Sequence, residues 1–226
     1  MSRTLDPAAH AARRATYVEA ADALLRSGGY ARLSIDEVIA AAGGSKGGFY
    51  HYFSSKQELL AAVVERMTGS TAVEVRAIVD GPGDALEKFG LVVAAMPAGR
   101  RDAANLMLGL LEVWYADDNA ALREAARQSS HEALRAPLTT LLDQGAREHL
   151  MAPVSVVGGA DVLASLMVAM ADAASRTWWL HRRGEISTED AVAVLDGYAD
   201  AIDRVLGVPP GTAFRQDHAL LRSWFA

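Results

Sequence analysis

The hydrophobic and polar positions of this chain repeat with helical spacing along most of its length. Apolar residues recur three and four positions apart, whereas the alternation of apolar and polar residues that marks a half-buried strand is nearly absent. The chain is also rich in alanine and holds only 7 prolines among 226 residues, which favours helices. The pattern therefore predicts an all-α protein.

Two short helices joined by a glycine turn are predicted over residues 34–53. Ser34 and Glu37 form an S-x-x-E capping box, in which each side chain can satisfy a free amide at the start of a helix. Apolar residues then fall at i, i+3, i+4 and i+7, and Gly43 with Gly44 ends the helix. Ser45 is a suitable N-cap for the second helix. This arrangement is a helix-turn-helix.

The second of these helices carries polar chemistry on one side. Phe49 and Phe53, four residues apart, can point inward. The outward groups include no acidic residue between Glu37 and Glu58; they are Lys46, Gly47, Gly48, Tyr50, His51 and Tyr52, followed by Lys56. Cations and hydroxyls donate to phosphate oxygens, a helix N-terminus favours an anion, and glycines let the backbone approach a duplex closely. We expect this face to bind DNA.

The stretch resembles the DNA-binding domain of the tetracycline-repressor (TetR) family of bacterial transcriptional regulators. The resemblance covers about residues 10–67 and is carried by Gly29 and Tyr30, by LSIDEVIAAAG from Leu33, and by SKGGFYHYFSSKQELL from Ser45. In the last segment, Ser55 and Glu58 form a second capping box. One departure is Gly44, where the family usually has a small apolar residue such as valine, so a looser turn is expected.

The resemblance implies roles for individual residues. Ser34, Tyr50 and Lys56 would hold phosphates, and the residues around Lys46 and His51 would lie nearest the base edges of the major groove. The predicted DNA-binding set comprises Ser34, Ser45, Lys46, Gly47, Gly48, Tyr50, His51, Tyr52 and Lys56. Arg13 and Arg14, at the start of the first helix, could add to these cations or be ordinary surface residues.

Length and charge suggest a small DNA-binding domain over residues 1–67 and a larger helical domain over 68–226. The net charge of −6 does not oppose DNA binding, because residues 1–67 hold 8 Lys and Arg against 7 Asp and Glu, whereas residues 68–226 hold 14 against 21. A few cations that converge on one face are sufficient for a DNA-binding surface.

Other classes of function find little support. The absence of cysteine removes disulfides, thiolate zinc sites and a Cys nucleophile, and fits a reducing compartment. GGSKGG is not a true phosphate-binding loop, because Gly47 follows Lys46 and a helix precedes it; the six His residues form no H-E-x-x-H motif. We expect no enzyme, metal or cofactor. Without an apolar membrane-spanning run or an export signal, a cytoplasmic protein with no membrane partner is expected.

Beyond residue 67 the pattern predicts helices to about 79 and over 84–96, 101–116, 119–149, 160–183 and 188–206. Pro137 should kink or split the fourth of these, and 153–159 is predicted as a loop. The tail from Val208 is harder to assign; His218 to Phe225 could form one or two helical turns.

The last two long helices have more apolar surface than one subunit easily covers. The resemblance implies that they pair with a second copy, through Leu163, Leu166, Met167, Ala174, Leu195, Tyr198 and Ile202. A two-fold homodimer would place its DNA-binding helices about one DNA turn apart, roughly 34–36 Å or somewhat more in this family, and would require a palindromic operator. The alternative is that both faces pack within their own subunit.

The middle helices combine aromatic side chains with flexible methionines, a composition that suits an apolar pocket but also an ordinary core. The candidate pocket residues are Phe89, Val93, Met96, Met107, Leu110, Leu111, Trp114, Leu134, Leu138, Met170 and Trp178. In the family, a small ligand in this region changes the separation of the DNA-binding helices. The expected function is thus an effector-released repressor; the alternatives are a regulator without a ligand and a helical small-molecule carrier.

Overall fold

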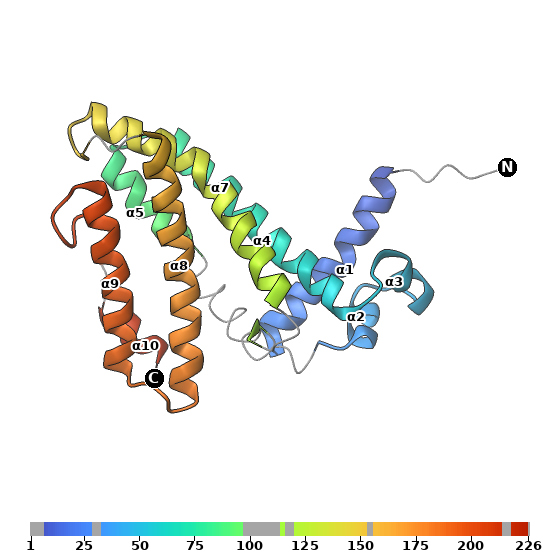
Figure 1. Ribbon diagram of the computed structural model, residues 1–226. Helices are drawn as coiled ribbons and strands as arrows, with labels where there is room; N and C mark the ends of the chain where they lie inside the picture. Colours follow the sequence, from blue (N-terminus) through green and yellow to red (C-terminus); the bar gives the residue numbers. More distant parts are fainter. Residues whose placement is uncertain are drawn as a thin grey trace. The chain divides into compact units, whose positions relative to one another are not determined.

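The computed structural model describes residues 7–28, 33–96, 114–115, 120–152, 156–213 and 218–225. Within these ranges the chain forms α-helices joined by turns, which confirms the all-α prediction. The longer helices are α1 (Pro7–Gly28), α4 (Lys56–Asp80), α5 (Ala85–Ala95), α7 (Ala120–Arg147), α8 (Val156–Arg182) and α9 (Thr188–Leu206) (Figure 1). The short ones are α2 (Ile35–Ala41), α3 (Lys46–Tyr52) and α10 (His218–Trp224).

The chain divides into two compact units, each with a hydrophobic core of its own. Unit 1 comprises Met1–Met67 with Asn105–Arg123, and unit 2 comprises Thr68–Ala104 with Glu124–Ala226. None of the described helices combines the length and the hydropathy that a bilayer crossing requires.

Unit 1 folds around aromatic side chains of α1 and α3. Phe49 and Phe53 are fully buried, as their spacing predicts, and their ring centroids lie 5.6 and 6.5 Å from that of Tyr17 on α1. Val38 of α2 and Leu59 of α4 are also fully buried in this cluster. Burial of such large apolar side chains is the main force that holds short helices together, because helices of this length are unstable alone.

The predicted caps of the helix-turn-helix are present in the structure. Glu37 donates its backbone N–H to the Ser34 hydroxyl, at 3.1 Å, and its carboxylate accepts the backbone N–H of Ser34, at 3.2 Å. Ser45 accepts the N–H of Gly48 at 3.1 Å. These bonds fix the first residues of α2 and α3 without help from a ligand.

The cap of α4 differs from the predicted reciprocal box. Ser55 does accept the N–H of Glu58, at 3.1 Å. The Glu58 carboxylate, however, accepts from the backbone N–H and the hydroxyl of Ser54, both at 2.7 Å, instead of from Ser55. Two serines in succession offer two donors at this corner, and the carboxylate binds the earlier one.

Unit 2 packs α5, α7, α8, α9 and the second half of α4 around an aliphatic core. Fully buried side chains come from each of these helices, for example Val75, Phe89, Leu138, Leu163 and Ile202. The helices α8 and α9 lie side by side and run in opposite directions (Figure 1). Their connecting turn contains Gly184 at φ +70°, and α9 ends at Gly207, also at φ +70°, a left-handed conformation that favours glycine.

One prediction for unit 2 was wrong, and another was wrong in part. The segment 153–159 is not a loop throughout, because α8 already begins at Val156; Gly158 and Gly159, which suggested a loop, lie within its first turns. Helix α7 is not split at Pro137, since buried Leu134, Leu138 and Leu141 hold both sides of the proline in one core; the kink stays a prediction. Most of the predicted helix 101–116 lies outside the described residues.

Buried polar groups in unit 2 are paired with backbone atoms. The Lys88 ammonium, 6% exposed, donates to the Val79 carbonyl at 2.9 Å and to the Gln144 side chain at 3.0 Å. The fully buried Asp203 carboxylate accepts the N–H groups of Gly211 and Ala213. Each bond satisfies a group that would otherwise destabilise the core, so both residues have a structural explanation.

Candidate nucleic-acid interface

The structure places the predicted DNA-binding residues at the surface of unit 1. Ser34, Ser45, Lys46, Gly47 and His51 are exposed, and Tyr50 is 49% exposed although it is aromatic. The remaining members of the set, Gly48, Tyr52 and Lys56, are half-buried. Because Phe49 and Phe53 anchor α3 from the inside, its polar side remains available to a partner.

The two glycines at the start of α3 have different surroundings. A Cβ atom at Gly47 would have no neighbouring atom within 4 Å, so nothing inside the protein requires glycine there. At Gly48, by contrast, a Cβ would lie 3.0 Å from the Tyr17 hydroxyl and 3.1 Å from Oγ of Ser45. Internal packing therefore accounts for Gly48, whereas the openness at Gly47 fits the predicted close approach of a duplex.

The departure from the family pattern at Gly44 is explained by Tyr17. A Cβ at Gly44 would collide with the Tyr17 hydroxyl and would lie 2.9 and 3.0 Å from its Cε1 and Cζ atoms. The tyrosine ring thus fills the space under the turn that a small apolar side chain would otherwise occupy. This packing argues against the looser turn that the glycine alone suggested.

Arg13 has a structural role in the helix-turn-helix. Its guanidinium donates to the carbonyl oxygens of Ala42 at 3.4 Å and Gly43 at 3.0 Å, at the end of α2. The same group lies 5.4 Å from the centroid of the Tyr17 ring. A cation at a helix C-terminus satisfies free carbonyls and interacts favourably with the helix dipole. Arg14 similarly lies over the Phe53 ring, at 5.1 Å.

Glu58, the first acidic residue after α3 along the chain, binds Ser54 at the start of α4. The backbone N–H and then the hydroxyl of Ser54 hold the pKa of Glu58 below its ordinary value, with a smaller contribution from the positive charge of Arg14. Glu58 is therefore ionised at neutral pH, and its charge is directed to the start of α4. The polar side of α3 itself contains no carboxylate.

One residue of this surface was not predicted from the sequence. The ring of His10, on α1, lies 4.6 Å from that of Tyr52 and 5.5 Å from that of His51, centroid to centroid. Nothing in the sequence near His10 indicates this contact, because it lies about 40 positions from its partners and depends on how α1 crosses α3. The spacing rules for a single helix carry no such information.

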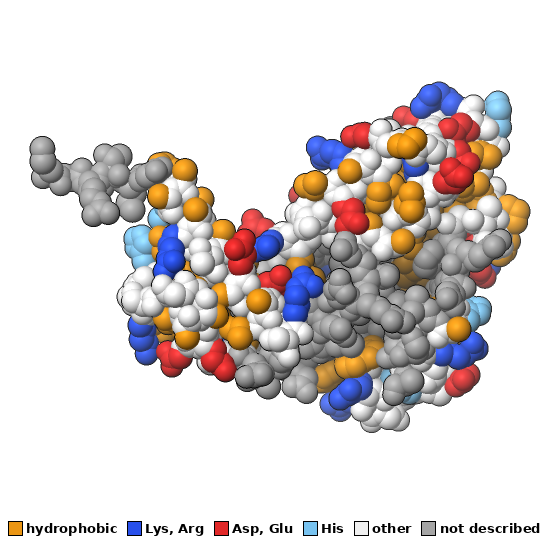
Figure 2. Space-filling model, turned by 180° about the vertical axis from the view of Figure 1, so that it is seen from behind, with side chains coloured by type: hydrophobic (Ala, Val, Ile, Leu, Met, Phe, Trp, Pro, Cys, Tyr) orange, Lys and Arg blue, Asp and Glu red, His pale blue; other side chains and the backbone are white. Residues whose placement is uncertain are grey.

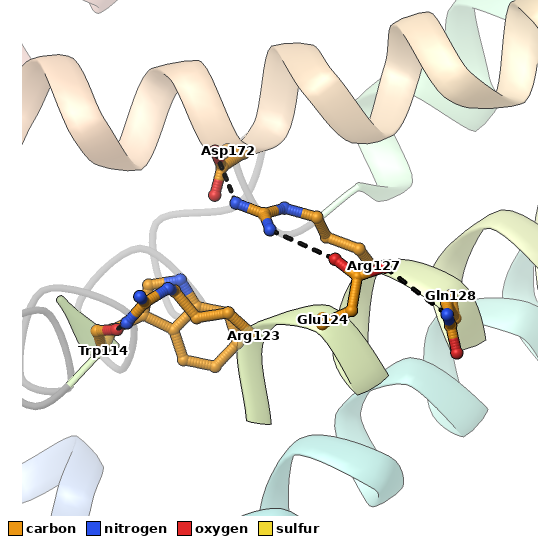
Figure 3. Close-up of polar contacts among 6 residues, drawn as sticks. All are labelled: Trp114, Arg123, Glu124, Arg127, Gln128 and Asp172. Carbon is orange, nitrogen blue, oxygen red and sulfur yellow. Dashed lines mark hydrogen bonds and ion pairs between the residues drawn. The ribbon is translucent and has the colours of Figure 1, made fainter. Parts of the chain in front are cut away.

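The candidate pocket residues lie in different parts of the structure, and some lie outside the described residues. Six of them pack together in the core of unit 2: Phe89, Val93, Met96, Leu134, Leu138 and Met170. Trp178 of α8 is half-buried, and Trp114 belongs to unit 1, where its carbonyl accepts from Arg123 (Figure 3). Met107, Leu110 and Leu111 lie outside the described residues. The effector pocket stays a prediction.

A groove with a volume of about 400 Å³ lies elsewhere in unit 2, between α7, α8 and Tyr198 of α9. Most of the residues that line it have charged or polar side chains. Arg127 of α7 reaches Asp172 of α8 at 3.1 Å and Glu124 at 3.4 Å, as Figure 3 shows. Although burial acts to lower it, the pKa of Arg127 is raised by these two carboxylates. The cation is thus bound within the protein, and small side chains such as Ala169 and Ala173 also line the groove.

The predicted dimer residues fall into two groups. Leu163, Met167, Leu195 and Ile202 are enclosed by the core of their own subunit and have almost no surface to offer a partner. Leu166, Ala174 and Tyr198 are half-buried. The first group thus packs within its own subunit, and the dimer interface stays a prediction.

Comparisons with known proteins agree with the geometry of unit 1. Residues 18–63 match the family model described as bacterial regulatory proteins, tetR family. A comparison with curated protein sequences gave no significant match. Among solved structures, the chain is similar to reduced NemR of Escherichia coli, with 20% identity, a TM-score of 0.55, and coverage of 87% of this chain and 99% of NemR.

Two further structures extend the similarity over the whole fold. A TetR transcription regulator of Haloarcula marismortui has 20% identity and a TM-score of 0.57, with 84% of this chain and 98% of that chain covered. RolR in complex with resorcinol has 16% identity and a TM-score of 0.58, with 98% and 96% covered. At these identities the structures show the fold, and the family model identifies the DNA-binding domain. Residues 18–63 therefore form a DNA-binding domain of the TetR type, and the described residues have the fold of TetR-family regulators.

Proposed function

We propose that this regulator acts in the cytoplasm as a homodimeric repressor that binds a palindromic operator and is released by a small, largely apolar effector. The observation that carries the DNA-binding part is the two-sided character of α3. Phe49 and Phe53 are fully buried, while Lys46, Tyr50 and His51 are exposed on a helix without any carboxylate. Such a helix can enter the major groove without loss of core contacts.

Within this proposal, phosphate contacts position the protein and base contacts select the sequence. Ser34, Tyr50 and Lys56 contact phosphates, whereas Lys46 and His51 reach base edges. The open environment of Gly47 lets the backbone at the start of α3 approach the duplex. Side-chain capping by Ser45 holds that N-terminus in position.

The dimer interface is proposed to use a second apolar stripe on each of α8 and α9. On α8 this stripe is Val162, Leu166, Ala169 and Ala173; on α9 it is Val194, Tyr198, Ala201 and Val205. In both helices the spacing is i, i+4, i+7 and i+11, the seam of a heptad pattern. Val162 is 50% exposed and Val194 43% exposed, and the other six are half-buried. These eight residues are called the outer seam below.

A second copy is the fitting occupant of the outer seam. Two antiparallel helices with the same heptad spacing, paired with their symmetry mates, form a four-helix bundle with a two-fold axis. Such a dimer presents two copies of α3 to one duplex and explains why valines on a helix surface face solvent in the single chain.

A structure with a bound ligand and the composition of unit 2 support a small effector. The solved structure of RolR contains resorcinol, a small aromatic molecule, and has the fold of this chain. In unit 2, Phe89 and the methionines Met96, Met167 and Met170 are buried in the core, and Trp178 of α8 is half-buried. A ligand that binds one dimer geometry better than the other would shift the equilibrium away from the DNA-bound form.

DNA binding is tested by selection of duplexes from a random-sequence pool, together with the DNA upstream of the chain's own gene. The proposal expects a recovered palindrome, bound with an affinity that falls steeply as salt rises. Tyr50→Ala should weaken binding to all sequences and leave the dimer intact, while Arg147→Ala, an exposed cation of unit 2, should change nothing.

Absence of any retained duplex at low salt would overturn the proposal and favour a helical small-molecule carrier. If DNA binds but no compound from a panel of small phenols and other apolar molecules changes the affinity, the regulator without an effector is the better description.

A further inference from the structure

Three aromatic rings from two helices meet at one edge of the proposed DNA-binding surface. His10 of α1 and His51 of α3 lie 5.5 Å apart, and both contact Tyr52, at 4.6 and 5.0 Å between ring centroids. His51 is exposed and His10 is partly exposed. Figure 2 shows pale-blue histidine side chains beside blue Lys and Arg side chains on the surface of unit 1. The two histidines are called the imidazole pair below.

Neither imidazole has a carboxylate partner among the described residues, although His131 and His218 of unit 2 do. The ionisable groups close in sequence to the pair are cations or phenols: Arg13, Arg14 and Tyr17 on α1, Lys46, Tyr50 and Tyr52 on α3, and Lys56 at the start of α4. The acids of α1, Glu19 and Asp22, lie more than two helical turns from His10 and pair with Arg66 and Arg26. The acids nearby are Glu58, which binds Ser54, Glu37, which binds Ser34, and exposed Asp36 on α2. The pair therefore lacks an internal counter-charge.

An external anion would supply that counter-charge. Histidine is the side chain that changes charge between pH 5 and 8, and an imidazolium donates a charge-assisted hydrogen bond to a phosphate oxygen. Two imidazolium groups this close repel each other, and a phosphate beside both offsets the repulsion. Protonation and DNA binding would then favour each other, as linked equilibria must.

We propose that His10 belongs to the DNA-binding surface and that the imidazole pair binds a backbone phosphate in its protonated form, so that operator binding takes up protons. This inference rests on the proposed DNA-binding function. It adds a residue from α1 to the phosphate-contacting set and makes the affinity of the repressor dependent on pH in the physiological range.

The test measures the affinity of the full chain for the duplex recovered by selection, by fluorescence anisotropy at pH 8.0 and pH 6.0 and at several salt concentrations. For the wild type, binding should be on the order of tenfold tighter at pH 6.0, and the salt slope should be steeper there by about one phosphate contact per subunit. His10→Gln and His51→Gln should each reduce the pH dependence, and the double variant should abolish it.

His51→Arg, which fixes a positive charge, should bind at pH 8.0 more tightly than the wild type. The matched control is His149→Asn in unit 2, an exposed histidine at φ +59°, a conformation that asparagine tolerates; its pH dependence should equal that of the wild type. Thermal unfolding of each variant checks the fold.

Proton uptake can also be measured without any substitution. Calorimetric titration of the duplex at pH 7 in two buffers of different ionisation enthalpy gives the number of protons bound, which should be positive. Zero or negative uptake by the wild type overturns the inference while DNA binding stands. A wild-type pH dependence in His10→Gln removes His10 from the surface, and absence of binding at every pH overturns this inference together with the proposed function.

Discussion

The adjacent glycines of α3 show how a single residue can serve packing or function. Gly48 lies against the Tyr17 hydroxyl and the cap of Ser45, so its lack of a side chain is required by neighbours inside unit 1. Gly47 is surrounded by open space. Because glycine costs about 0.5–1 kcal/mol in a helix relative to alanine, an unconstrained glycine at this position indicates a cause outside the folded chain.

Gly47→Ala should therefore raise stability and weaken DNA binding. We expect the free energy of unfolding to rise by about 0.5–1 kcal/mol, measured in urea. Operator affinity should fall on the order of tenfold, because one backbone–phosphate hydrogen bond is lost or lengthened. Gly69→Ala, in an exposed and open site of α4, should stabilise similarly without changing the affinity. Equal affinity for the Gly47 variant and the wild type would contradict the proposed approach of the backbone.

The contact of Gly44 with Tyr17 gives a second prediction at this scale. Gly44→Ala should lower the free energy of unfolding by roughly 1–3 kcal/mol, because its Cβ has no room beside the tyrosine ring. Tyr17→Phe, which removes the closest atom, should recover part of this loss in the double variant. Gly197→Ala on the exposed surface of α9 serves as the control and should be neutral or stabilising. An unaltered unfolding midpoint in Gly44→Ala would show that the ring moves freely.

Local sequence rules predicted the residues of the helix-turn-helix better than their partners. The caps at Ser34 and Ser45 and the inward positions of Phe49 and Phe53 follow from spacing within one helix, and the structure confirms them. The contacts of Arg13 with Gly43 and of His10 with Tyr52 join residues 30 or more positions apart. Such contacts depend on the crossing of two helices, which no local pattern encodes.

Among the helices, those whose sequence contains a capping box at the N-terminus were predicted best. Helices α5 and α9 have capping boxes, at Asp84 with Glu87 and at Ser187 with Asp190, and the predicted ranges agree with the observed ones within about two residues. The start of α8 has no such signal, and the glycines near it indicated a loop. Tertiary packing overrode local preference there and at Pro137.

The start of α4 offers a prediction on pH and stability. The folded state holds the pKa of Glu58 below its ordinary value, chiefly through hydrogen bonds from Ser54. This carboxylate therefore stabilises the fold above its unfolded-state pKa, and the contribution is lost as pH falls through the lower pKa of the folded state. Glu58→Gln should destabilise unit 1 at pH 7 and should lose less stability than the wild type between pH 7 and pH 3.

Urea unfolding at a series of pH values checks this expectation. Glu65→Gln, at an exposed position of the same helix, is the control and should follow the wild-type curve. If the curves of Glu58→Gln and the wild type stay parallel down to pH 3, the cap does not contribute to acid sensitivity.

At the scale of the whole molecule, the proposed dimer interface shows where a helical pattern in the sequence is ambiguous. Of the residues that the sequence suggested, the structure buries Leu163, Met167, Leu195 and Ile202 in the subunit core, whereas half-buried Leu166 and Tyr198 belong to the outer seam. The outer seam lies about one residue away along each helix, a rotation of roughly 100°. Both stripes are apolar, so the sequence cannot tell which one faces its own core; the exposure of Val162 and Val194 distinguishes them.

Charges placed on the outer seam should separate the subunits without unfolding them. The double variant Val162→Glu with Val194→Glu puts four carboxylates into the proposed two-fold interface, where like charges and lost apolar burial both oppose association. Light scattering after size-exclusion chromatography should show a monomer for this variant and a dimer for the wild type. Val73→Glu, at a valine that is 71% exposed on α4, should remain dimeric.

Loss of the dimer should also reveal how much affinity comes from two linked half-sites. A monomer binds each half-site independently, so affinity for a full palindrome should fall by roughly 10²–10⁴, while affinity for a single half-site should be unchanged. The comparison of the two affinities distinguishes loss of the dimer interface from damage to α3, because damage to α3 would weaken binding to the palindrome and to the half-site alike. A double variant that stays dimeric at micromolar concentration would place the contact between subunits on another surface, whereas loss of half-site binding as well would indicate damage to the DNA-binding unit.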